Sequence, residues 1–79
     1  MRTIRTIPHE KCNITIFHWN NRYLVKLENG LFEQTYKIPQ YDLAGEGDLD
    51  AIISEEFIDE SVARFEQMAE SLRKAMARL

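Results

Sequence analysis

The pair Asn29-Gly30 constrains the fold of this chain more than any other feature. It lies between two runs in which apolar and polar residues alternate, at 23–28 and 31–38. Asparagine and glycine both tolerate positive φ, which a two-residue type I′ hairpin turn requires. The pattern therefore predicts a β-hairpin, and the position of its turn determines which side chains share a face of the sheet.

A second two-residue turn is predicted at Asn20-Asn21, because asparagine enters the left-handed region more readily than most residues. The residues before this turn are rich in β-branched and aromatic side chains, which favour strands. The two turns together predict an antiparallel meander of three strands, at 12–19, 22–28 and 31–38.

Pairing the strands outward from both turns gives one consistent apolar face. The first turn places Ile16 opposite Val25, and the second places Leu27 opposite Phe32. A one-residue error in register would have mixed polar side chains into this face. The predicted core face consists of Ile14, Ile16, Tyr23, Val25, Leu27, Phe32, Tyr36 and Ile38.

The first eleven residues allow two arrangements. Ile4 and Ile7 could belong to an edge strand, since Pro8 is acceptable at the end of such a strand. The same segment could instead fold back over the second face of the sheet. The sequence leaves both open, so the sheet has three strands or four.

After a connector at 39–47, the chain becomes helical to its end. Asp48 is expected to cap a short helix at 48–54, and a long helix is expected at 56–78. Whether Ser54 or Asp59 begins the long helix is left open. The long helix carries an apolar stripe with alternating spacings of four and three, formed by Ile58, Val62, Phe65, Ala69, Leu72, Met76 and Leu79. Packing this stripe on the sheet predicts a two-layer α+β fold.

The long helix and the sheet differ in length. A helix over 59–79 is about 32 Å long, whereas a strand over 23–29 spans about 24 Å. Because the stripe continues to Leu79, the last turns are expected to extend beyond the sheet.

The length and net charge of the chain exclude several classes of function. Seventy-nine residues make a single small domain, residues 1–79, and a domain of this size gains from oligomerisation. The single cysteine permits no intrachain disulfide, and a formal charge of −3 disfavours anionic membranes and non-specific nucleic-acid binding. No apolar run approaches the roughly 18 residues of a membrane span, and no secretory signal is evident, so a cytoplasmic protein is expected.

The second face of the predicted sheet is mostly polar, with three exceptions. Phe17 lies opposite Leu24, and Trp19 lies two residues further along the same strand. Exposed apolar clusters often mark contact sites. The sequence therefore predicts a non-enzymatic interaction module, most simply a homodimer, with an unidentified protein as another partner. The expected interface residues are Phe17, Trp19, Leu24, Leu72, Met76 and Leu79.

Single-stranded nucleic acid is the alternative partner. Aromatic side chains on a sheet with nearby cations resemble the stacking platforms that bind single strands. The residues of this alternative face are Phe17, Trp19, Arg22, Lys26 and Lys37, and the negative net charge weighs against it.

Catalytic or metal chemistry has little support in the sequence. His9, Glu10, Cys12 and His18 follow no structural zinc spacing, and Cys12 with His9 lacks any sign of an oxyanion hole. The three glycines form no phosphate-binding loop. We therefore expect no enzyme activity, no metal and no cofactor.

Several segments resemble a small family of uncharacterised bacterial proteins. The resemblance covers most of the chain and implies no activity, because that family has no assigned function and no catalytic motif. It is carried by the segments 14–17, 19–21, 23–28, 33–35 and 55–58.

Overall fold

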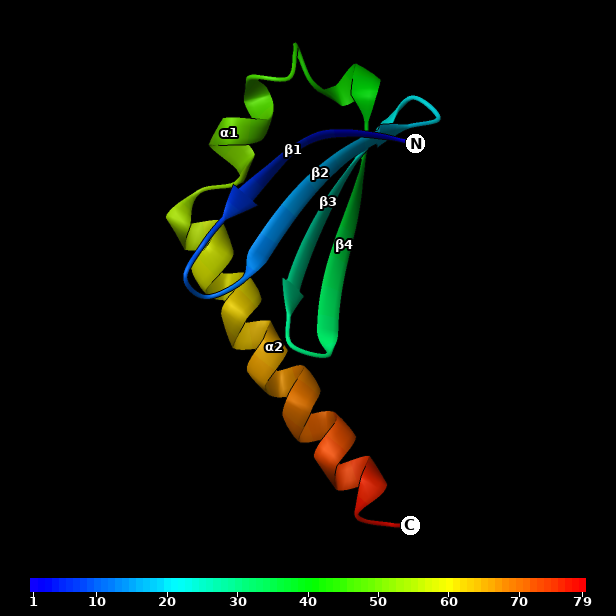
Figure 1. Cartoon of the computed structure of the whole chain (residues 1–79), viewed down its shortest axis with the longest axis vertical. Coiled ribbons are helices and arrows are strands. Elements are labelled where there is room, and N and C mark those ends of the chain that lie inside the picture. The colour runs from blue at the N-terminus through cyan, green and yellow to red at the C-terminus, as the bar shows by residue number, and fades with distance from the viewer.

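A four-stranded antiparallel sheet and a long helix dominate the fold (Figure 1). The structure is a computed structural model that describes residues 1–79. The strands lie in chain order, and the helices follow them. The elements are β1 (Arg2–Pro8), β2 (Asn13–Trp19), β3 (Arg22–Asn29), β4 (Phe32–Pro39), a 3-10 turn (Gln40–Asp42), α1 (Asp48–Ile52) and α2 (Glu55–Met76).

The N-terminal segment forms an edge strand. β1 pairs with β2 and places Ile7 opposite Ile14, and its register shifts between Thr3 and Arg5. Of the two arrangements that the sequence allowed, the structure has the fourth strand. Residues 2–8 therefore widen the sheet at its edge and do not cover its second face.

The β2–β3 hairpin has the predicted turn and the predicted register. Asn20 and Asn21 have φ values of 52° and 61°, which are the positive values that a type I′ turn requires. Ile16 lies opposite Val25, as the turn position implied.

The predicted register of the β3–β4 hairpin is wrong by two residues. Asn29 pairs with Phe32, so the turn residues are Gly30 and Leu31, and Leu27 lies opposite Gln34. Only Gly30 has positive φ in this turn, at +61°, which fits a type II′ turn with glycine in its first central position.

The side chain of Asn29 explains why the turn lies one residue later than predicted. Its Nδ2 donates a hydrogen bond of 3.0 Å to the backbone oxygen of Lys11, which holds Asn29 in β3. Moving the turn by one residue changes the pairing by two, so every side chain keeps its face. The predicted core face therefore remains the core face.

The core lies between that face and the two helices. Its fully buried members from the sheet include Ile14, Ile16, Val25 and Leu27, and the helices contribute Leu49, Ile58 and Phe65. Phe32, Tyr36 and Ile38 are only partly buried and pack against this core.

The helices begin and end near the predicted residues, with one correction. Asp48 is not the N-cap of α1, because Gly47 occupies that position and Asp48 Oδ2 accepts a hydrogen bond from the backbone N–H of Ala44 instead. Ser54 caps α2, and its Oγ accepts the backbone N–H of Phe57 at 3.1 Å. Ser54 and not Asp59 therefore begins the long helix.

Ion pairs connect the β1 side of the sheet to the helices. Arg5 pairs with Asp50, and three further pairs follow the same order along both segments. They join Arg2 to Glu46 at 3.9 Å, Lys11 to Asp59 at 3.3 Å and, as a hydrogen-bonding contact, His9 to Glu55 at 3.2 Å. Exposed pairs of this kind are individually weak, so they orient the helices more than they stabilise the fold.

The long helix extends past the sheet, as the lengths predicted. The protein measures 46 × 25 × 19 Å, and the last turns of α2 project beyond the β3–β4 hairpin (Figure 1). We call residues 69–79 the tail. Every residue of the tail is exposed, whereas Ile58 and Phe65 on the same stripe are buried. No helix combines the length and apolarity needed to cross a lipid bilayer.

Candidate functional site

The tail carries the largest exposed apolar side chains of α2. Leu72 is 47% exposed, Met76 is 56% exposed and Leu79 is 99% exposed. All three continue the stripe that packs on the sheet further up the helix. The last turns of α2 project beyond the sheet, so most of this part of the stripe has no covering element (Figure 1).

An ion pair stabilises the polar side of the tail. Arg73 donates two hydrogen bonds to Glu70, at 3.0 Å from Nε and 2.6 Å from Nη2. These bonds hold the pKa of the Glu70 carboxyl below its usual range. The pair therefore stays ionised at neutral pH and supports the helical conformation of the tail without any contact to the sheet.

A groove lies where the tail leaves the sheet. Its volume is about 660 Å³, and its apolar lining comes from Phe32 on β4 and from Met68 and Leu72 on α2. The remaining lining residues are Gln34, Arg64, Gln67 and Ser71. The groove joins the beginning of β4 to the exposed stripe, so the two surfaces form one continuous region.

The outer face of the sheet is less exposed than the sequence predicted. Leu24 is only 7% exposed, so its expected availability at an interface is wrong. It lies in a central strand, opposite Phe17 on one side and Lys37 on the other, and such neighbours cover a side chain from both sides. Phe17 is half-buried, and Trp19 is 48% exposed.

Acidic side chains lie among the cations of the outer face. Lys26 lies 3.7 Å from Glu28 and 3.5 Å from Glu33, so acidic neighbours offset its charge. Arg22 lies opposite Trp19 at the end of the β2–β3 hairpin, and Lys37 is exposed on β4. Lys37 faces Leu24, which lies between Arg22 and Lys26 on β3, so the three cations remain on one face of the sheet.

The Cys12 environment opposes nucleophilic chemistry. Cys12 is buried in the core, and burial, with a smaller contribution from Glu55, raises the pKa of its thiol. His9 is engaged elsewhere, since its Nε2 lies 3.2 Å from Glu55 and its Nδ1 accepts the N–H of Lys11. No group of three or more metal-ligating side chains converges in the structure.

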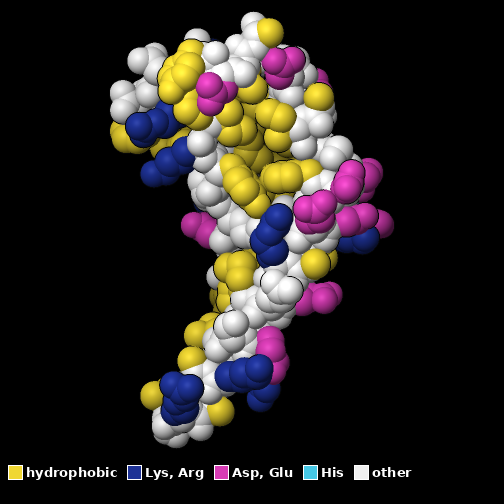
Figure 2. Space-filling model, turned by 180° about the vertical axis from the view of Figure 1, so that it is seen from behind, with side chains coloured by type: hydrophobic (Ala, Val, Ile, Leu, Met, Phe, Trp, Pro, Cys, Tyr) yellow, Lys and Arg dark blue, Asp and Glu magenta, His cyan; other side chains and the backbone are white.

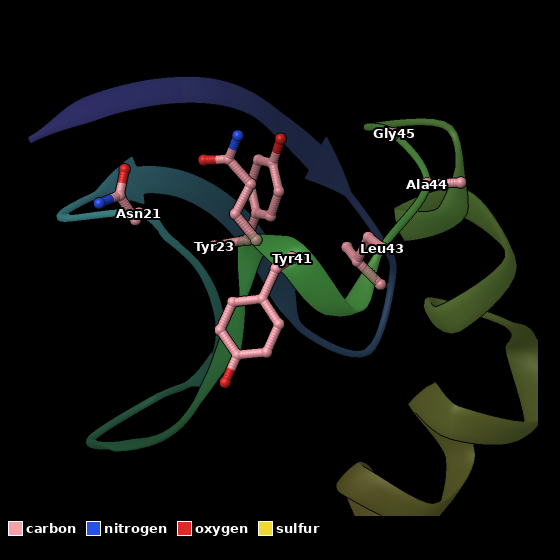
Figure 3. A pocket seen from close by; sticks show the side chains of 7 residues that line it. Asn21, Tyr23, Tyr41, Leu43, Ala44 and Gly45 are labelled. Carbon is pink, nitrogen blue, oxygen red and sulfur yellow. The ribbon is translucent and has the colours of Figure 1, made fainter.

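A second cavity of about 500 Å³ lies at the opposite end of the molecule from the tail. Tyr23, Leu43 and Tyr41 supply its larger apolar side chains, with Asn21 and Gln40 among the polar ones (Figure 3). The Gln40 Oε1 atom lies 2.6 Å from His18 Nε2, and the His18 ring lies against Tyr23, with 5.1 Å between centroids. These contacts indicate that His18 has a structural role, as a side chain packed beside the cavity.

Charge is distributed unevenly between the two ends of the molecule. Eight acidic residues and no basic residue occur in 38–63, whereas 64–79 contains four basic and two acidic residues. Seen from behind, hydrophobic side chains gather in a hollow in the half that holds the sheet, with acidic groups along its margin (Figure 2). Lysine and arginine side chains lie near the end of α2, and others lie at one side of the sheet.

Comparison with protein-family models, with curated proteins and with solved structures finds no match to this chain. The family resemblance of the sequence therefore stays a prediction. Any function has to be argued from the surfaces described above.

Proposed function

We propose that this protein is a non-enzymatic interaction module that forms a homodimer, and that the tail is part of its interface. The observation that carries this proposal is the exposed apolar surface of Leu72 and Met76 in the last turns of α2 and of Leu79 just after the helix, where the chain projects beyond the sheet. A helix that only covered the sheet would have no need for apolar residues there.

The free energy gained by burying these apolar side chains between two copies supports the proposal. Full burial of a leucine or methionine side chain contributes about 1.5–3 kcal/mol relative to exposure. A domain of this size has a small core, so burial between two copies adds substantially to its stability. The alternating spacing of four and three also suits packing of one helix on another.

Trp19 is a secondary candidate contact. It is half-exposed beside Arg22, whereas Leu24 is buried and Phe17 is partly covered. This smaller apolar surface supports either a protein contact or the alternative partner, single-stranded nucleic acid. The acidic neighbours of Lys26 weaken the second possibility.

The proposal is tested by the molar mass of the protein in solution. Light scattering across a dilution series should give a dimer that dissociates on dilution. The double variant Leu72→Ser with Met76→Ser should shift dissociation to at least tenfold higher concentration, because it removes two apolar side chains from the interface.

A matched control distinguishes loss of the interface from loss of helix. Ala63→Ser with Lys74→Ser places two serines on the exposed polar side of α2, away from the groove, at a similar cost in helix propensity, and should leave the dimer unchanged. A monomer at every concentration would contradict the proposal. Quenching of Trp19 fluorescence by a short single-stranded oligonucleotide, reversed by salt, would then favour the alternative.

A further inference from the structure

The two edges of the sheet differ in how well they are protected from pairing. β1 has a register shift between Thr3 and Arg5, ends at Pro8 and carries arginines that pair with the acidic side of the helices. Irregularity, proline and charge are common ways in which proteins block edge pairing. β4 also ends at a proline, Pro39, but its pairing with β3 is regular over eight residues and it has no partner strand on its outer side.

The backbone of β4 presents a defined set of groups at this free edge. Because Asn29 and Phe32 flank a two-residue turn, the even-numbered residues of β4 bond to β3. The N–H of Gln40 continues this pattern with a 2.9 Å bond to the oxygen of Asn21. The N–H and C=O groups of Glu33, Thr35 and Lys37 therefore point outward.

We propose that the free edge of β4 pairs with β4 of a second copy, antiparallel, with the two-fold axis at Thr35. This inference rests on the proposed homodimer and specifies one of its contacts. Thr35 then lies opposite the partner's Thr35, and Glu33 lies opposite the partner's Lys37. The outward-facing residues become the hydrogen-bonded pairs, so all six of their backbone groups are satisfied.

The opposite charges of Glu33 and Lys37 favour this register over the neighbouring ones. Glu33 and Lys37 are both exposed. Lys37 has no ion pair in the protomer, whereas Glu33 Oε2 lies 3.5 Å from Lys26 Nζ. Opposite charges on directly facing residues stabilise an antiparallel pair. Shifting the register by two residues in either direction places Glu33 opposite Thr35 or Pro39, and shifting by one moves the apolar residues to the wrong face.

The inner face of β4 supports the same register. Phe32 faces the partner's Ile38, so two partly buried apolar side chains meet. Gln34 faces the partner's Tyr36. In the protomer, Gln34 Nε2 donates to the backbone oxygen of Ser61 at 2.7 Å, while Gln34 Oε1 is buried without a partner. The Tyr36 hydroxyl accepts a bond from Arg64 at 3.1 Å, which leaves its own proton free to donate.

The pairing also has a consequence for the tails. It forms a continuous sheet of eight strands with both α2 helices on the same face. The tail passes the β3–β4 hairpin toward the β4 side in the view of Figure 1, so it points toward the partner. Because the copies are antiparallel, the basic tail of one approaches the acidic half of the other (Figure 2).

Charge exchange tests this register directly. Glu33→Lys and Lys37→Glu should each weaken dimerisation about tenfold, because each puts like charges together at two symmetric positions. The double variant restores both opposite pairs and should dimerise within about threefold of the unmodified protein. Lys26→Gln removes the intramolecular neighbour of Glu33 and should leave the dimer unchanged.

Cross-linking tests the position of the axis. Thr35→Cys should form a disulfide-linked dimer under mild oxidation, because hydrogen-bonded antiparallel residues have Cα atoms about 5.5 Å apart, within disulfide range. Thr6→Cys puts a thiol at an exposed position on β1 and should not cross-link between copies. The native Cys12 is buried and stays in both variants.

The outcomes separate this inference from the proposed function. A dimer that neither charge reversal weakens and that Thr35→Cys does not cross-link would overturn the β4 pairing and leave the homodimer standing. A protein that is monomeric throughout the dilution series would overturn both. Loss of the dimer in each single charge variant with recovery in the double variant would support the pairing.

Discussion

Individual side chains of this protein have roles that follow from how deeply they are buried. Cys12 and His9 are close in sequence and have the residue types of a nucleophile and its base. The structure buries the thiol and engages both nitrogens of His9. Desolvation disfavours the thiolate, so Cys12 acts as a small apolar side chain of the core.

The raised pKa of Cys12 leads to a prediction about its reactivity. Burial is the main cause of the shift and the carboxylate of Glu55 the second, so less thiolate is present than in an unfolded chain at the same pH. At pH 8.5, alkylation by iodoacetamide should be at least tenfold slower in the native protein than in guanidinium chloride. Mass spectrometry of timed samples measures both rates. Equal rates would mean that the Cys12 thiol is accessible to the reagent and that folding does not raise its pKa.

The same shift gives a direction for alkaline stability. The pKa of Cys12 is higher in the folded state than in the unfolded state, so the folded state holds this proton more tightly. The stabilisation is complete below the unfolded pKa and is lost as the pH rises toward the folded pKa. Deprotonation of Cys12 therefore opposes folding only in alkaline solution.

At the scale of elements, the beginning of α2 is set by one side chain. Ser54 has an extended conformation, and its Oγ accepts the N–H of Phe57. Glu55 and Glu56 follow in the first turn, where negative charge complements the helix dipole. The cap separates α2 from α1 and fixes where the buried stripe begins.

Removing this cap should destabilise the protein measurably. Ser54→Ala is expected to lower the free energy of unfolding by about 1 kcal/mol, because the N–H of Phe57 loses its acceptor. Ser54→Asp keeps an acceptor and should stay within about 0.5 kcal/mol of the unmodified protein. Urea unfolding followed by circular dichroism gives both values. An unchanged midpoint for Ser54→Ala would show that the cap is not needed.

At the scale of the whole molecule, the sheet, α1 and the first half of α2 form the folded unit. The helix contributes its buried residues Ile58, Ser61 and Phe65 before the tail begins. The tail adds exposed surface and apolar side chains without a contact in the core. The core is therefore formed without the tail, whereas the proposed association uses both the tail and the free edge of β4.

Truncation separates these two roles. A chain that ends at Glu70 loses only exposed residues, so its free energy of unfolding, measured under monomeric conditions, should change by no more than about 0.5 kcal/mol. Its dimer should dissociate at concentrations at least tenfold higher, as light scattering would show. A large loss of stability in the monomer would mean that the tail belongs to the folded unit.

Much of the fold could be predicted from the sequence because its signals are local. Asn20-Asn21 specified its turn, and the alternation in β2 and β3 identified the core face. The β3–β4 register could not be derived, because two adjacent turn positions fit the same alternation and a contact between Asn29 and Lys11 selects between them. The sequence did not predict Ser61 as a core residue, because nothing in the local pattern distinguishes it from an exposed serine.

The candidate site was predicted less completely. The exposed tail followed from the mismatch between helix and strand lengths, which the sequence contains. The burial of Leu24 did not, because it depends on neighbours from two other strands. The sequence contains Glu33 and Lys37 on either side of Thr35. They can be interpreted as a pairing surface only when β4 is known to be a free edge of the sheet.

The sequence by itself determined the turn at Asn20-Asn21, the faces of the strands and the stripe of α2. These depend on φ preferences and periodicity, which act within a few residues. Only the tertiary structure decided the second hairpin register, the place of β1 at the edge, the burial of Leu24 and the unpartnered oxygen of Gln34. Those features depend on which distant segments meet, and that is settled by packing and hydrogen bonding across the whole chain.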